Sequence, residues 1–363
     1  MRLKHISLFF ILALMSNTII AAPQIKQNKR IVRTYKLKPE TQVEVYNKYG
    51  KVEIIHWNKD SVKYVINLET RAKTKDKIEK LEALLNFSFQ GGENYIRAQT
   101  LIGSESNDLL SEISNLTNAI FTIGAEVDID FTVYMPANNK LKIENSFGDV
   151  FMGDFNPNLQ IDLSHGDLRT GKLNSSSIIN IRFGHAFIEY IKEGKMKVSY
   201  ADMDISKSKM LDIESKVSKI KIDQIDALSL DSRRDAYEIG SIDYLKGSSN
   251  FSNIKLNTFK KELKLKLKYG ALRMDKISNL FSAIDVTSNY TDITMIIEEG
   301  ASYKISITET DVSISYPKEK IQLSKELIDK EKDTNKYAGK KGNNPKSNIL
   351  IEAEKGSIKI FQE

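Results

Sequence analysis

Residues 141–155, LKIENSFGDVFMGDF, form the first complete copy of a repeat that fills most of the chain after them. With Phe147 as position zero, the matching residues follow at intervals of 17 to 21 residues and are His165, Phe183, Tyr200, Val217, Arg234, Phe251, Tyr269 and Tyr290. The third residue after position zero is apolar in all nine copies, although the residues around it change. A sustained period of this length predicts a stack of equivalent structural units.

Each copy has the pattern of a strand, a tight turn, a second strand and a loop. Before position zero, apolar and polar residues alternate, as in Leu159, Ile161 and Leu163, which indicates a strand buried on one face. Gly148-Asp149 marks the turn, because glycine tolerates positive φ and aspartate bonds its own backbone. A period of 17 to 18 residues is too short for a propeller blade. We therefore predict an all-β chain, a parallel β-helix (β-solenoid) with coils ~4.8 Å apart.

The N-terminal residues 1–21 are predicted to be a secretory signal peptide. They combine a short basic start, an apolar run from Ile6 to Met15 and small residues at the expected cleavage point after Ala21. Cleavage there lowers the formal net charge from +6 to +4, because Arg2 and Lys4 are lost. The chain has no cysteine, so it has no disulfides and no thiolate metal site.

The mature chain divides into five expected segments. Residues 22–60 form a first solenoid coil, and 61–140 an α+β capping insertion with helices at 75–85 and 107–119, a hairpin at 87–101 and a strand at 127–135. The alternative for this insertion is a separate ligand-binding domain. Solenoid repeats follow at 141–317, a polar and mobile loop insertion at 318–348, and a final coil at 349–363.

Composition and charge narrow the possible partners. The sequence pI is about 9.0, but lysines alternate with acidic residues and no nucleic-acid motif occurs, so nucleic acid is not an expected partner. No later run of apolar residues is long enough for a membrane-spanning helix. We expect a protein that does not span the membrane, is a monomer, and binds an unidentified polymer or envelope protein.

The sequence resembles the putative adhesin family of exported bacterial β-solenoid proteins, which is related to the head GIN domain proteins and common in Bacteroidota. Three features carry the resemblance: the start at Tyr49-Gly50, the strand Val127–Met135 followed by Pro136, and the run of Gly-Asp coils. It implies a single-stranded right-handed β-helix of 17–21-residue coils and an exported protein, and it supplies no catalytic residue. Val217-Ser218-Lys219 and Ser232–Asp235 depart from the Gly-Asp pattern.

Few residues suggest a catalytic or metal-binding site. His56, His165 and His185 do not form a metal-ligand pattern, and no nucleophile, zinc-protease or phosphate-loop motif occurs. Parallel β-helices host polysaccharide lyases and hydrolases, and for that alternative Arg233, Arg234 and Asp235 are the candidate residues. We expect that the protein is not an enzyme.

A weak metal hypothesis concerns the second residue after position zero. Asp149 and Asp167 fall there in neighbouring coils, and Asp292 and Asp311 form a second such pair, so that each pair could attract Ca²⁺. The alternative is that aspartate suits a tight turn. No other cofactor is expected.

The functional expectation is an exported, non-catalytic binding protein, adhesin-like or structural in the cell envelope. It would be periplasmic, at the cell surface or secreted. A polysaccharide-active enzyme and an envelope-stress accessory protein are the alternatives.

Overall fold

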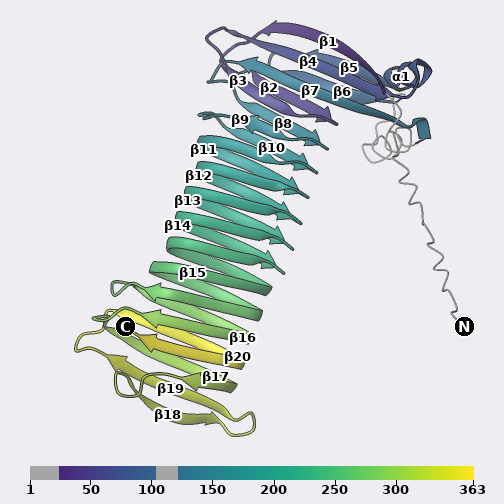
Figure 1. Cartoon of the computed structure of the whole chain (residues 1–363). Coiled ribbons are helices and arrows are strands. Elements are labelled where there is room, and N and C mark those ends of the chain that lie inside the picture. Colours follow the sequence, from purple (N-terminus) through teal and green to yellow (C-terminus); the bar gives the residue numbers. More distant parts are fainter. Residues whose placement is uncertain (1–23, 104–121) are drawn as a thin grey trace, which may run out of the picture.

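The computed structural model describes residues 24–103 and 122–363. Strands account for 75% of the structure and helix for 3%, and the strands belong to one 20-stranded, mostly parallel sheet. Figure 1 shows a tall stack of coils with further strands at both ends. The expected signal peptide (1–21) and the expected helix at 107–119 lie outside the described residues.

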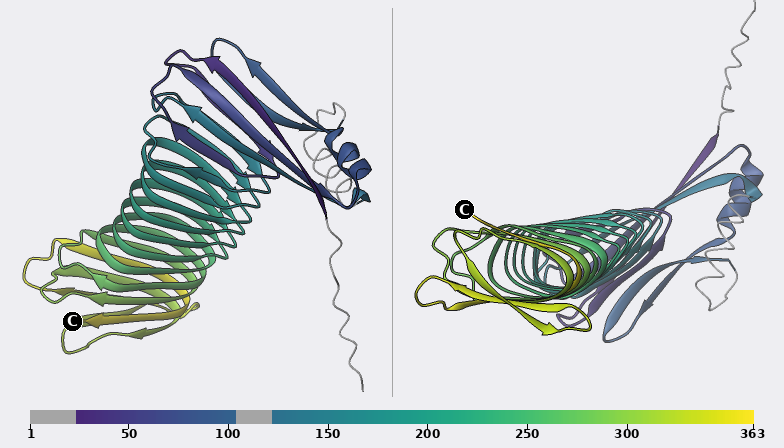
Figure 2. Two further views of the ribbon diagram at one scale, coloured as in Figure 1. Left: turned by 45° about the horizontal axis from the view of Figure 1, so that its top comes forward. Right: turned by 90° about the horizontal axis from the view of Figure 1, so that it is seen from below.

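The stack is built from parallel coils, as expected for a β-solenoid. Leu159 lies opposite Leu141 of the coil before it and Ser177 of the coil after it, each 18 residues away. Seen end-on in the right view of Figure 2, the coils overlie one another as a flattened ring. The strands are β8 (Leu141–Ser146), β9 (Val150–Met152), β10 (Leu159–Ser164), β11 (Leu168–Arg182), β12 (His185–Ser199), β13 (Asp202–Lys216), β14 (Lys219–Arg233), β15 (Ala236–Ile277) and β16 (Ala283–Ile297).

The core lies inside the coils, where the apolar residues of successive coils stack. All nine residues at the third position after position zero are at most 2% exposed: Val150, Leu168, Ala186, Met203, Ile220, Tyr237, Ile254, Leu272 and Ile293. The apolar period in the sequence therefore identified the inward face correctly. Burial of these side chains is the main favourable contribution to stability in a fold with so little helix.

The turn geometry differs from the expectation. Positive φ occurs at position zero itself, with values of 50° to 60° from Tyr49 through Tyr290, and not at the glycines Gly148, Gly166 and Gly184 that follow it. These glycines are required by the spacing between coils instead. A Cβ on Gly166 would lie 2.1 Å from the carbonyl oxygen of Gly148, which is far inside van der Waals contact.

The N-terminal end extends the stack. The coil of β2 and β3 pairs with β8 and β9 on one side and with β6 and β7 on the other. The helix α1, the β5–β6 hairpin and strand β7 confirm the helix, the hairpin and the strand that the sequence predicted here. Strand β1 was not anticipated; it pairs antiparallel with β4 as an exposed edge strand. The elements are β1 (Ile25–Lys36), β2 (Gln42–Lys48), β3 (Val52–His56), β4 (Ser61–Ala72), α1 (Lys75–Glu82), β5 (Leu85–Gly91), β6 (Tyr95–Ile102) and β7 (Ala125–Met135).

The single tryptophan lies at this end, between β3 and β4. Its indole N–H donates to the carbonyl oxygen of Ser61 at 2.8 Å, and its ring lies 5.6 Å from that of Tyr134. Trp57 is thus fixed between two strands of the N-terminal end of the stack.

The C-terminal end corrects two expectations. The polar loop expected at 318–348 contains two strands, which form an antiparallel hairpin that pairs with β17. The expected final coil, β20, lies between β16 and β17 and pairs parallel with both. The elements are β17 (Tyr303–Ser315), β18 (Gln322–Asp329), β19 (Thr334–Lys341) and β20 (Ser347–Gln362).

This order also changes the register of the last repeat. Asp311 aligns with Tyr290 and Lys355 at position zero and has φ of 57°, so it is not the second residue of its turn. The neighbour of Asp292 is Ser357, whose hydroxyl donates to Asp292 at 2.6 Å. The expected pair of Asp292 and Asp311 is therefore not formed. In the described part of the chain, no helix is long and apolar enough to span a membrane.

Candidate binding face

Asp149 and Asp167 lie in neighbouring turns, as expected, and each bonds to the coil that follows. Oδ1 of Asp149 accepts the backbone N–H of Asp167 at 2.8 Å, and Oδ1 of Asp167 accepts that of His185 at 2.9 Å. In later turns a backbone carbonyl accepts this hydrogen bond in place of the aspartate side chain. The backbone N–H of Asp202, for example, donates to the carbonyl oxygen of Gly184 at 3.0 Å. The geometry therefore gives the turn aspartates a hydrogen-bonding role. Within residues 24–103 and 122–363, no group of three or more acidic or histidine side chains is placed to hold a metal ion.

The three histidines among the described residues lie in different environments. The ring of His165 is stacked between Phe147 and Phe183, with centroid distances of 4.8 and 4.7 Å. His185 Nε2 lies 2.8 Å from a carboxylate oxygen of Asp204. His56 lies beside Phe155, and partial burial lowers its pKa. No shared site results from these positions.

The residues considered for catalysis do not converge. Asp235 is 5% exposed, and it occupies the turn position that is glycine in earlier coils. Its carboxyl group accepts hydrogen bonds of 2.7 to 2.8 Å from four groups, the hydroxyls of Ser215 and Ser232 and the backbone N–H groups of Ser218 and Arg233. The side chains of Arg233 and Arg234 are exposed. Asp235 therefore holds an irregular turn together from inside the corner.

The position-zero residues form two stacks of rings along one corner. Neighbouring ring centroids are 4.6 to 5.2 Å apart from Tyr49 to Tyr200 and from Phe251 to Tyr290, with Val217 and Arg234 between the two stacks. A non-glycine residue at positive φ costs roughly 1–3 kcal/mol, and a stacked aromatic pair contributes ~0.5–1.5 kcal/mol. Ring stacking thus offsets part of the backbone strain. Within each stack, the faces of the inner rings cover each other.

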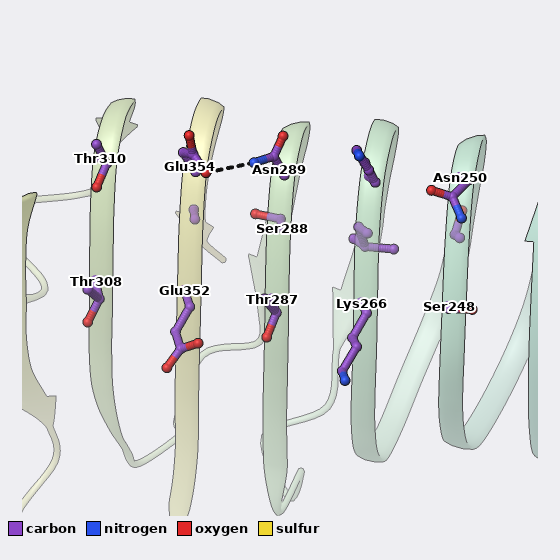
Figure 3. A pocket seen from close by; sticks show the side chains of 14 residues that line it. Ser248, Asn250, Lys266, Thr287, Ser288, Asn289, Thr308, Thr310, Glu352 and Glu354 are labelled. Atoms are coloured by element: carbon purple, nitrogen blue, oxygen red, sulfur yellow. Dashed lines mark hydrogen bonds between the residues drawn. The ribbon is translucent and has the colours of Figure 1, made fainter. Parts of the chain in front are cut away.

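A groove crosses the outward face of the strands that precede position zero. Its polar part, with a volume of about 460 Å³, spans five strand segments: Ser248–Asn250, Lys266–Lys268, Thr287–Asn289, Thr308–Thr310 and Glu352–Glu354. Figure 3 shows these side chains side by side on neighbouring strands, with Asn289 donating to Glu354 at 2.8 Å. The groove is therefore lined by two rows of polar side chains, which are short on three of the strand segments and are lysine or glutamate on the other two.

The apolar part of the groove adjoins the polar part, two residues earlier on three of the same strand segments. It has a volume of about 640 Å³ and is lined by Met210, Ala227, Tyr244 and Ala283 beside charged residues such as Lys264 and Asp285. Met210 and Tyr244 are 53% and 43% exposed, and the two alanines leave a depression beside them. We call both parts together the sheet-face groove.

A charged pair borders Tyr244. Lys261 Nζ lies 5.2 Å from the centroid of the Tyr244 ring and 2.9 Å from an oxygen of Asp243. The hydrogen bond to Asp243 raises the pKa of Lys261, so this lysine is charged at neutral pH. The phenol ring of Tyr244 thus has a fixed cation beside it.

The sheet-face groove was not identified from the sequence. Its outward residues alternate with the core residues, and this alternation indicates an outward face without indicating a groove in it. Its residues come from β13, β14, β15, β16, β17 and β20, and the position of β20 beside β16 could not be known from sequence order. The available signal was the run of short hydroxyl and amide residues one and three places before position zero.

Neither a protein-family model nor a curated protein matches the sequence. Similar solved structures include a "putative cell adhesion protein" from Clostridium sporogenes, with 12% identity, a TM-score of 0.20, and coverage of 92% of this chain and 100% of that chain. A "putative adhesin" from Parabacteroides distasonis has 10% identity and a TM-score of 0.37, and the match covers 73% of this chain and 96% of that chain. Another "putative adhesin", from Bacteroides fragilis, has 11% identity and a TM-score of 0.32, and the match covers 92% of this chain and 97% of that chain. At these values the likenesses carry no argument about function.

Proposed function

We propose that the protein is an exported, non-catalytic, adhesin-like binding protein that holds an extended polymer in the sheet-face groove. The observation that carries this proposal is the polar part of the groove, which crosses five neighbouring strand segments. An open trough of this kind suits a chain molecule, whereas small-molecule sites enclose most of their ligand.

The strands that form the groove are fixed before any ligand arrives. Strand β16 pairs with β15 and β20, and β20 pairs with β17, so the outward side chains stand on a hydrogen-bonded floor. A preformed surface loses little conformational freedom on binding, which favours affinity. We also propose that the stack is a right-handed β-solenoid, since connections between parallel strands of one sheet are right-handed in ~98% of cases.

Export is supported by the apolar leader at residues 1–21. Cell fractionation followed by N-terminal sequencing tests it. We expect the mature chain outside the cytoplasm, beginning at Ala22. A cytoplasmic protein that keeps residues 1–21 would contradict export.

Retention on immobilised polymers tests the binding role. The purified protein is passed over insoluble cellulose, mannan, chitin, pectin and collagen, and the Thr287→Trp variant is run beside it. Thr287 is exposed in the polar part of the groove, so a tryptophan there fills the trough. We expect at least one polymer to retain the wild type and to release the variant.

The matched control is Thr294→Trp, because Thr294 lies on the same strand β16 but outside the groove residues. This variant should be retained like the wild type. Equal retention of all three proteins, or retention of none, would refute the binding role. New reducing ends in the flow-through would refute the non-catalytic part of the proposal.

A further inference from the structure

The rows of the sheet-face groove repeat at a spacing that limits the ligand. Neighbouring strands lie ~4.8 Å apart, so each row offers one polar side chain per ~4.8 Å. In an extended polypeptide, side chains on the same face recur every ~6.6 Å, because the chain rises ~3.3 Å per residue and successive side chains point to opposite faces. The sugar rings of an extended glycan recur at a distance close to the strand spacing, and where alternate rings are turned over the same ring face recurs at about every second strand. The rows therefore match a glycan better than a peptide.

The charges in the polar part balance. Lys266 and Lys268 lie on one side of the Thr287–Asn289 segment and Glu352 and Glu354 on the other, and the remaining outward side chains are hydroxyls and amides. A polyanion would place repeating negative charge against the two glutamates, and a polycation would place positive charge against the two lysines. An uncharged chain meets neither repulsion, and its hydroxyls can donate to the carboxylates and accept from the ammonium groups.

The apolar part offers a different contact. The exposed ring of Tyr244 and the side chain of Met210 stand beside the small residues Ala227 and Ala283. A pyranose ring is polar at its rim and carries C–H groups on its faces, so it can contact an aromatic ring while its hydroxyls reach Lys264 or Asp285. Both parts of the groove thus fit the same class of ligand.

From these observations we propose that the sheet-face groove binds an uncharged linear polysaccharide that runs across the strands, with successive sugar rings over successive coils. This inference rests on the proposed binding function and names its ligand class. Since the polar part spans five strand segments, affinity should rise with chain length up to about five sugars and then level off.

Isothermal titration calorimetry tests the ligand class. The probes are soluble oligomers of two to eight sugars, made of β-1,4-linked glucose, mannose or N-acetylglucosamine, with oligogalacturonate as the acidic and chitosan oligomers as the basic comparison. We expect at least one uncharged series to bind at least tenfold more tightly than both charged ones. Its affinity should increase with length up to about five sugars.

Two variants keep the test specific. Thr287→Trp should weaken the binding of the six-sugar chain at least tenfold, and Thr294→Trp should leave it unchanged, while the circular dichroism of both variants stays as in the wild type. Preference for a charged series, with loss of binding in Thr287→Trp, would overturn the ligand class but leave the proposed function standing. No binding of any oligomer, together with no retention on any polymer, would overturn both.

Discussion

Tyr303 and Tyr237 are both buried, and they differ in what their hydroxyls contact. The hydroxyl of Tyr237 lies 2.6 Å from that of Ser215, whereas the hydroxyl of Tyr303 has no partner among the described residues. An unpaired buried hydroxyl costs ~1–3 kcal/mol, and a satisfied one contributes ~0.5–1.5 kcal/mol. We therefore expect Tyr303→Phe to stabilise the protein and Tyr237→Phe to destabilise it. Urea unfolding near neutral pH measures both changes.

The same tyrosine predicts a pH dependence. Burial raises the pKa of Tyr303 to about 12, whereas an unfolded tyrosine titrates near pH ~10. Between these values the unfolded chain loses a proton that the folded chain keeps, so stability falls as pH rises through this window. Below pH ~10 this loss is absent. The stability difference between Tyr303→Phe and the wild type should thus widen above pH ~10; a constant difference would contradict the assignment.

At the scale of the turn, two glycines make a matched pair. A Cβ on Gly166 would meet the carbonyl oxygen of Gly148 at 2.1 Å, whereas a Cβ on Gly153 would have nothing within 4 Å. We expect Gly166→Ala to cost at least ~1–3 kcal/mol, because two coils must separate. Gly153→Ala should be neutral or stabilise by ~0.4–1 kcal/mol through the unfolded state. Thermal melting of the two variants compares them directly.

The calcium hypothesis belongs to the same turns. If Asp149 and Asp167 bind Ca²⁺, a hundredfold excess over the dissociation constant adds ~2.7 kcal/mol to stability, and EDTA reverses the rise in melting temperature. The double variant Asp149→Asn with Asp167→Asn should lose that rise. Its metal-free stability should stay close to the wild type, because the amide oxygen still accepts the N–H groups of Asp167 and His185. A wild-type melting curve unaffected by millimolar Ca²⁺ would end the hypothesis.

The elements that the sequence predicted are those whose side chains carry a period. Ile220 and Ile222 alternate with lysines, so their strand and its inward face were evident. Strand β1 was missed because its residues are mostly polar and exposed, and backbone bonds to β4 hold it in place. The positive φ at position zero was missed because bulky rings are unusual there. Only the stacking of one coil on the next explains why rings are tolerated.

The order of coils in space is a property of the whole molecule that no local pattern encodes. Strand β20 contains the expected repeat, yet it lies between β16 and β17 rather than at the end of the stack. Substitutions of an inward and an outward residue of β20 therefore test whether this strand lies between β16 and β17. Ile351 is fully buried, and its neighbour Leu350 is 42% exposed.

We expect Ile351→Ala to cost ~2–5 kcal/mol, because it leaves a cavity where three coils meet. Leu350→Ala should change stability by less than ~0.5 kcal/mol. Limited proteolysis should cleave the Ile351→Ala protein first within residues 303–341, which lose their support from β20. Equal sensitivity of the two variants would contradict the central place of this strand.

The fluorescence of Trp57 can report on the unfolding of one end of the protein. Because it is the single tryptophan and stands beside Tyr134 at the N-terminal end, its fluorescence emission follows the opening of that end alone. Far-UV circular dichroism instead averages over every coil. Stacked coils contact mainly their neighbours, so their ends can open before the middle. We expect the emission to change at a lower urea concentration than the dichroism, and coincident curves would mean that the whole stack melts as one cooperative unit.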